Sequence, residues 1–148
     1  MKTTPSFDLI VYGATPGGIA AACSAAEKGL SVGLLEPSRF VGGHLTSGIC
    51  TTECGHMLPA SFYGWMMKFL HRMGAHYGVD GPLHRWEPHV TEKAYEELLH
   101  EADVRVVREF DLETVRKDSG RIRSVTSLAG KTFEAAVFID ASYEGDLM

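Results

Sequence analysis

The stretch from residue 7 to residue 37 constrains the fold most, because it places a helix-forming run between two short apolar runs. The first run, FDLIVYG (7–13), is rich in β-formers and ends in glycine, as buried parallel strands often do. Small residues dominate 17–28, which favours a helix, and Gly29 follows as its stop. The second run, LSVGLLEP (30–37), also fits a buried strand. This order predicts two parallel strands joined by a helix.

The rest of the chain continues the α/β pattern. Ser61 and Thr91 are expected as N-caps of two amphipathic helices. The last third alternates short strand-like runs with turns, which predicts a small antiparallel meander ending in the apolar run AAVFID (135–140). The fold class is therefore α/β, a Rossmann-like parallel sheet with helices on one face and the meander on the other. The further predicted elements are helices over 61–78 and 91–103 and a strand over 104–110.

Composition narrows the class of protein. The 148 residues suit one domain spanning 1–148, and 45% apolar with 22% charged residues is typical of a globular protein. A net charge of −5 argues against nucleic acid or an anionic membrane as the partner. No apolar run approaches the roughly 20 residues of a membrane helix, and no signal-peptide pattern opens the chain. Three cysteines, an odd number, fit a reducing compartment, so a cytoplasmic protein is expected.

The turn after the first strand, GATPGG (13–18), looks like a G-x-G-x-x-G dinucleotide-binding turn. Gly13 suits the tight exit from the strand, and Gly18 lets the helix pack closely on the sheet. Backbone N–H groups at the helix start, aided by the helix dipole, would hold a pyrophosphate. Thr15 stands where the motif has its middle glycine. Either the fit is looser there, or the threonine hydroxyl becomes a phosphate contact.

Glu36 indicates which nucleotides fit. It ends the second strand roughly 20 residues after the turn, where an acid accepts hydrogen bonds from ribose hydroxyls. A carboxylate at this place would repel a 2′-phosphate, which favours FAD or NAD over NADP. The alternative is a flavodoxin-like or other α/β unit with an incidental glycine turn.

A second glycine motif favours FAD. The string Arg39-x-x-Gly42-Gly43-His44 resembles the R-x-x-G-G-[RH] element that follows the ribose-binding acid in FAD-dependent oxidoreductases. Two adjacent glycines let the backbone run close to the diphosphate and the flavin, where a β-carbon would clash. A simple NAD dehydrogenase has no need of this pair. Taken alone, the string also fits an ordinary glycine turn with a solvated Arg39.

The resemblance extends over nearly the whole chain. The segments GATPGGIAAA, LLEPSRFVGGHLTSG, EPHVTEKAYEELL and FIDASYEGDLM are similar to the N-terminal part of the xanthan-lyase-like FAD-dependent oxidoreductases. This family implies a flavoprotein fold with two dinucleotide-binding domains and FAD extended across the carboxyl edge of the sheet. It also implies a redox reaction on a small, unidentified substrate.

The C-terminal ASYEGDL (141–147) resembles the A-T-G-x-G-D element of such flavoproteins, whose Asp contacts the ribityl or pyrophosphate part of FAD. By this resemblance Gly145 and Asp146 are candidates, although Ser142 and Tyr143 replace the commoner Thr-Gly. Asp146 alternatively caps the start of a helix. The full candidate cofactor-binding set is Gly13, Thr15, Pro16, Gly17, Gly18, Glu36, Pro37, Arg39, Gly42, Gly43, His44, Gly145 and Asp146.

The cysteines and histidines of the loop after Gly43 invite a metal or redox interpretation. The spacing Cys50-x3-Cys54 misses both the C-x2-C pair common in zinc sites and the C-x4-C pair of disulfide-reductase flavoproteins. We therefore expect free cysteines on a loop near the flavin, and no metal. His44 and His56 lie in the same loop and are candidate acids or bases, but no catalytic residue is assigned.

These features leave three functional hypotheses. The leading one is the FAD-binding domain of an oxidoreductase that passes hydride or electrons through flavin N5. Because family members continue well beyond Met148, we expect a fragment of a longer enzyme with weak or absent turnover alone. The alternatives are a fragment of an NAD-dependent dehydrogenase and a non-catalytic nucleotide-binding or assembly module, which Thr15 favours. The WMMKFL segment (65–70) is expected in a helix core, or, if exposed, to drive homo-oligomerisation.

Overall fold

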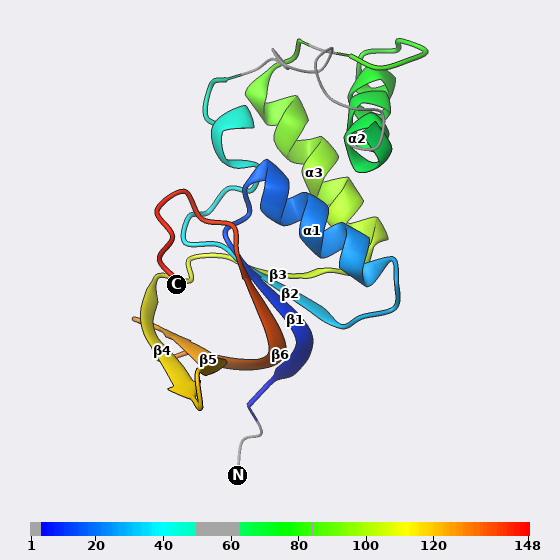
Figure 1. Cartoon of the computed structure of the whole chain (residues 1–148). Helices are drawn as coiled ribbons and strands as arrows, with labels where there is room; N and C mark the ends of the chain where they lie inside the picture. Colours follow the sequence, from blue (N-terminus) through cyan, green and yellow to red (C-terminus); the bar gives the residue numbers. More distant parts are fainter. Residues whose placement is uncertain (1–3, 50–62, 84) are drawn as a thin grey trace.

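The structure, a computed structural model, describes residues 4–49, 63–83 and 85–148 and centres on a six-stranded sheet of order β3-β2-β1-β6-β5-β4 (Figure 1). The pairs β3–β2, β2–β1 and β1–β6 are parallel, whereas β6–β5 and β5–β4 are antiparallel. The strands are β1 (Ser6–Tyr12), β2 (Val32–Leu35), β3 (Arg105–Val107), β4 (Leu112–Asp118), β5 (Arg121–Ser127) and β6 (Thr132–Asp140). The helices are α1 (Pro16–Ala26), α2 (Tyr63–His76) and α3 (Pro88–Glu101), with a short 3₁₀ turn η1 (Gly43–Leu45).

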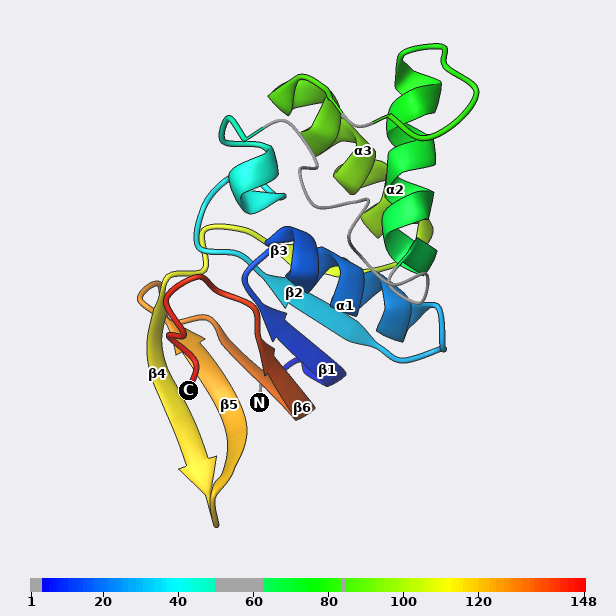
Figure 2. The same ribbon diagram turned by 45° about the horizontal axis from the view of Figure 1, so that its top comes forward.

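The β1–α1–β2 unit has the predicted arrangement. All four residues of β2 are buried, as expected for a parallel strand covered on both faces. The helix α1 packs on β1 and β2, and α3 lies beside α1 with α2 packed against it (Figure 2). Because the two parallel strands run in the same direction, their carboxyl ends meet at one edge of the sheet.

Two cores lie on opposite faces of the sheet, because side chains alternate along a strand. Leu9 and Val11 of β1 join the core under the helices. Ile10 and Tyr12 join the other core, together with Val125 of β5. The sheet curves so that its strands β4 and β5 lie away from the helices, at the lower left of Figure 1. The predicted fold class, with helices on one face and a meander on the other, is confirmed.

Several predicted boundaries differ from the structure. Thr91 is not an N-cap: α3 begins three residues earlier at Pro88, with Glu87 as its N-cap. Proline suits the first helical position because its missing N–H is not needed there. Thr91 is instead buried within the helix, and its hydroxyl donates to Glu87 O at 3.3 Å. The expected N-cap Ser61 lies outside the described residues.

The strand predicted over 104–110 is shorter than expected. It ends at Val107, because Glu109 has a left-handed φ of 54° and Phe110 N–H donates to Glu36 O at 3.0 Å. These two features turn the chain toward β4. The last strand is longer than its apolar run, since β6 already begins at Thr132.

The WMMKFL segment belongs to the core, as predicted. Phe69 and Leu70 are buried, and Trp65, Met66 and Met67 pack against the same core from α2. Within the part of the chain that the structure describes, no helix combines the length and apolar character needed to cross a membrane.

Candidate functional site

The turn between β1 and α1 is packed backbone against backbone. Gly13 has a φ of 98°, and its N–H donates to Leu35 O at 2.8 Å. A Cβ at Gly13 would lie 2.8 Å from the backbone of Ala141, and a Cβ at Gly18 would overlap Gly13 O. Both glycines are therefore required by the protein's own packing, which holds the start of α1 against the ends of β1 and β6.

Thr15 has a role that the motif alone does not suggest. It is the N-cap of α1: its Oγ1 accepts the Gly18 N–H at 3.2 Å and donates to Ala141 O at 2.9 Å. The hydroxyl thus closes the first turn of the helix and ties it to the end of β6. The signal for the cap was present in the sequence, as a threonine directly before proline at a helix start.

One backbone donor at the start of α1 points outward. Pro16 has no N–H, and Thr15 occupies the N–H of Gly18. Gly17 N–H has no acceptor among the described residues, and Gly17 is exposed. A Cβ at Gly17 would meet only Thr15 Oγ1, at 3.9 Å. This end of the helix carries the positive end of the dipole and has room for a pyrophosphate.

Glu36 directly follows β2, beside this turn, and is half-buried. Its Oε2 accepts the Ala14 N–H at 2.7 Å, and its Oε1 accepts the Ser38 N–H at 2.8 Å. Each carboxylate oxygen has a second lone pair, so two acceptor positions remain for ribose hydroxyls. Pro37, also half-buried, follows directly.

The second glycine pair lies against the first turn. Gly42 N–H donates to Ala14 O at 2.7 Å, which joins the two glycine-rich loops. A Cβ at Gly42 would come within 2.8 Å of the Tyr95 ring, and a Cβ at Gly43 would overlap Tyr143 Oη. The φ angles of this pair, 103° and 52°, also favour glycine. The glycines therefore make room for two tyrosines, a reason that the motif did not reveal.

Tyr143 connects the Gly42–Gly43 loop to the segment after β6. Its Oη accepts the His44 N–H at 3.0 Å, and the two rings stack with centroids 4.1 Å apart and an angle of 13°. Both side chains are exposed. Arg39 is also exposed, with its guanidinium 5.8 Å from the Phe40 ring centre, and it does not join this cluster.

Asp140, at the end of β6, organises the last loop and was missed by the sequence analysis. Its carboxylate accepts the Ser142 N–H at 3.0 Å and hydroxyl at 2.7 Å, and the Leu147 N–H at 2.9 Å. Partial burial raises the pKa of Asp140, but the hydrogen bonds from Ser142 and Leu147 outweigh this effect and hold it below its ordinary value. Ser142 Oγ in turn accepts the N–H groups of Gly145 and Asp146.

The segment from Gly145 to Met148 follows this loop. Residues 145–148 form one turn, in which Met148 N–H donates to Gly145 O at 3.3 Å. The Asp146 side chain is exposed beside Gly145, which has a φ of 76°.

Three loops thus meet at the carboxyl edge of the sheet: the β1–α1 turn, the Gly42–Gly43 loop with η1, and the loop after β6 (Figure 2). Cys50, Cys54 and His56 lie outside the described residues. Among the residues that are described, no three His, Cys, Asp or Glu side chains gather in a way that suits a metal ion.

The fold and this edge define a Rossmann-like class of domain. The sequence profile of the FAD dependent oxidoreductase family matches residues 8–148, so the chain belongs to this family. Its cofactor is FAD.

Solved structures share the fold at low sequence identity. L-proline dehydrogenase from P. horikoshii has a TM-score of 0.72 and 11% identity, over 99% of this chain and 55% of that one. L-amino acid deaminase from Proteus vulgaris has a TM-score of 0.68 and 14% identity, over 96% and 49%. The myxobacterial chondrochloren halogenase CndH, a variant of FAD-dependent halogenases, has a TM-score of 0.64 and 21% identity, over 93% and 37%. The chain spans between about a third and just over half of the structures that it matches.

Proposed function

We propose that this chain is the FAD-binding domain of a longer flavin-dependent oxidoreductase, which acts on an unidentified small substrate. The observation that carries the proposal is the outward Gly17 N–H at the start of α1, beside a Glu36 carboxylate that keeps two free acceptor positions. Together they offer a donor for a pyrophosphate and acceptors for a ribose at neighbouring places on one edge.

Each loop then has a part in holding the cofactor. The α1 turn, with Thr15 and Pro16 fixing its shape, binds the pyrophosphate, and Glu36 with Pro37 binds the adenosine ribose. The Gly42–Gly43 loop and the loop carrying Gly145 and Asp146 flank the ribityl side, with Arg39 and His44 at the rim. When bound, FAD supplies the hydride or electron transfer.

We also propose that the chain alone does not turn over substrate. Arg39, His44 and Tyr143 are exposed at the carboxyl edge, so these residues do not shield the site from water. The matched structures are about two to three times as long as this chain, which supports a contribution from further residues to the substrate site.

The binding proposal is tested by titrating the purified chain with FAD. We expect a stoichiometric complex, and Glu36→Gln should raise the dissociation constant about tenfold, since it removes a charged acceptor of a ribose hydrogen bond. Glu113→Gln, at an exposed position on β4, is the matched control and should leave the affinity unchanged. Binding of NAD but not FAD, or equal effects of the two variants, would contradict the proposal.

The inactivity is tested by mixing the FAD complex anaerobically with panels of amino acids, alcohols and phenols. We expect no bleaching of the flavin absorbance in the time of a steady-state assay. Rapid, saturable bleaching by one of these substrates would show that the chain has a complete active site.

A further inference from the structure

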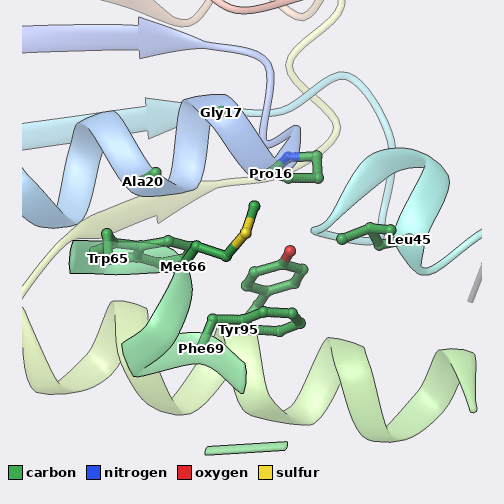
Figure 3. A pocket seen from close by; sticks show the side chains of 8 residues that line it. All are labelled: Pro16, Gly17, Ala20, Leu45, Trp65, Met66, Phe69 and Tyr95. Atoms are coloured by element: carbon green, nitrogen blue, oxygen red, sulfur yellow. The ribbon is translucent and has the colours of Figure 1, made fainter. Parts of the chain in front are cut away.

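A cavity of about 300 Å³ lies beside the start of α1, enclosed by the three helices and η1 (Figure 3). This volume falls at the lower end of the range for small-molecule sites. The cavity reaches Pro16 and Gly17 but extends away from the sheet edge, along α1 and toward α2 and α3. The other described residues that line it are Ala20, Leu45, Trp65, Met66, Phe69 and Tyr95.

The walls are apolar and largely aromatic. None of the described side chains that line the cavity carries a charge, so among them an ion would lose its hydration without compensation. The rings of Trp65, Phe69 and Tyr95 are nearly parallel, with angles of 1° and 9° from Trp65 to the other two and 11° between Phe69 and Tyr95. Parallel rings offer flat surfaces to a flat ligand, and the flexible Met66 can adjust its fit.

Two of the described lining residues carry a polar side-chain group, the indole N–H of Trp65 and the hydroxyl of Tyr95, and the hydroxyl points into the cavity. Tyr95 is 1% exposed, and its hydroxyl has no hydrogen-bond partner among the described residues. Figure 3 shows the hydroxyl directed toward the space between Met66, Pro16 and Leu45. Burial raises the pKa of Tyr95 strongly, so the phenol stays protonated and is available as a donor. A buried hydroxyl usually has a partner, and a ligand oxygen would provide one.

We propose that this cavity is a binding site for a neutral, flat, mostly apolar ring compound that carries one carbonyl oxygen. The ring lies against the parallel aromatic side chains, and the carbonyl oxygen accepts the hydrogen bond of Tyr95. The site borders the proposed FAD contacts at Pro16 and Gly17 and extends away from them between the helices, and its assignment to the substrate or acceptor rests on the proposed function. Its position beside Gly17 makes aryl ketones and related carbonyl compounds candidates for the substrate or electron acceptor of the longer enzyme.

The test uses the FAD-free chain and three flat probes of similar size, with binding measured by ligand-observed NMR. We expect 2-acetonaphthone to bind more tightly than naphthalene, which has no acceptor, and 2-naphthoate not to bind, because its charge would be buried. Tyr95→Phe should weaken the binding of 2-acetonaphthone about five- to tenfold, the usual size of one hydrogen bond, and leave naphthalene unaffected.

A pair of variants on α1 separates cavity binding from surface binding. Ala20→Leu places extra volume in the cavity and should abolish the binding of 2-acetonaphthone, whereas Ser24→Leu, one turn further along the helix and outside the cavity, should not. Thermal melts show that both variants are folded. Failure of 2-acetonaphthone to bind, equal binding of 2-naphthoate, or no effect of Ala20→Leu would overturn the proposal.

A last measurement distinguishes this site from the FAD site. FAD added at saturation should leave 2-acetonaphthone bound. Competitive displacement would mean that the flavin ring itself occupies the cavity, and a separate ligand site would be ruled out. Because the probe titrations contain no FAD, failure of the cavity proposal and failure of FAD binding give different results.

Discussion

The two glycine-rich loops at the carboxyl edge use glycine for different purposes. In the β1–α1 turn, a Cβ at Gly13 or Gly18 would meet backbone atoms, which cannot move without moving a strand or a helix. In the Gly42–Gly43 loop, the added Cβ atoms would meet side chains: Thr46 and Tyr95 at Gly42, and Tyr143 at Gly43. The two loops therefore differ in what limits them. Backbone atoms fix the first loop, whereas the exposed Tyr143 side chain can rotate away from the second.

Two similar sequence motifs therefore predict two different responses to change. A substitution in the first loop should disturb the fold, and one at Gly43 should be absorbed by a side chain. The following variants test this contrast, from the largest expected effect to the smallest.

Gly18→Ala should have the largest effect. Its Cβ would overlap Gly13 O and lie 3.0 Å from Ala141 Cβ, so we expect a loss of about 3 kcal/mol in the free energy of unfolding. Gly17→Ala is the control, since its Cβ meets only Thr15 Oγ1 at 3.9 Å. It should leave stability unchanged or slightly raised, yet weaken FAD binding by crowding the pyrophosphate. Urea unfolding measures the stability of the two variants. Equal losses in the free energy of unfolding would refute the description of this turn as fixed by the main chain.

Thr15→Val should cost about 2 kcal/mol, because it removes both the hydrogen bond to Gly18 N–H and the one to Ala141 O while keeping the side-chain shape. Thr15→Ser retains the hydroxyl and should stay within about 0.5 kcal/mol of the natural chain. The measurement is again urea unfolding. If serine costs as much as valine, the hydroxyl does not act as the cap.

Asp140→Asn should cost about 1 kcal/mol at pH 7. The pKa of Asp140 is lowered in the folded chain, so its carboxylate stabilises the fold above its ordinary pKa of 3.8, and this contribution is lost as the pH falls through the lowered value. The difference between the natural chain and the variant should therefore shrink as the pH falls below about 4. Unfolding curves at pH 7, 5 and 3 check this, and a pH-independent difference would contradict it.

Gly43→Ala tests the adjustable loop, and its energetic coupling to Tyr143 is the smallest effect of the series. Alone it should cost about 1 to 2 kcal/mol, partly for its φ of 52° and partly for displacing Tyr143. In a Tyr143→Ala background the displacement is absent, so a double-mutant cycle should give a coupling of about 0.5 to 1 kcal/mol. Additive effects would show that Tyr143 does not press on the glycine.

The sequence predicted the parts of the structure that depend on local pattern. The buried strands β1 and β2, the small-residue helix α1 and the meander follow from apolar runs and turn residues. The glycine motifs also indicated FAD, in agreement with the family. The roles of individual candidate residues in holding the cofactor remain predictions.

What the sequence did not reveal depends on contacts between distant segments. In the sequence, Asp140 is simply a polar residue at the end of a predicted strand. Only the folded loop brings the N–H of Leu147 to its carboxylate. Tyr143 and His44 stack across almost a hundred positions, which no local pattern encodes. Thr91 was predicted as a cap because threonine is favoured at N-caps, but α3 begins at Pro88, with Glu87 as its N-cap.

The position of β6 in the sheet has a consequence for how the chain is made. Ser6 of β1 lies opposite Glu134 of β6, so the edge of β1 that pairs with β6 stays uncovered until the chain has been made as far as β6. Parallel pairing over such a separation is slow to form, because the long intervening segment must be closed first. Until then Leu9 and Val11 sit on an open strand edge, where contact with a chaperone would protect the nascent chain from aggregation.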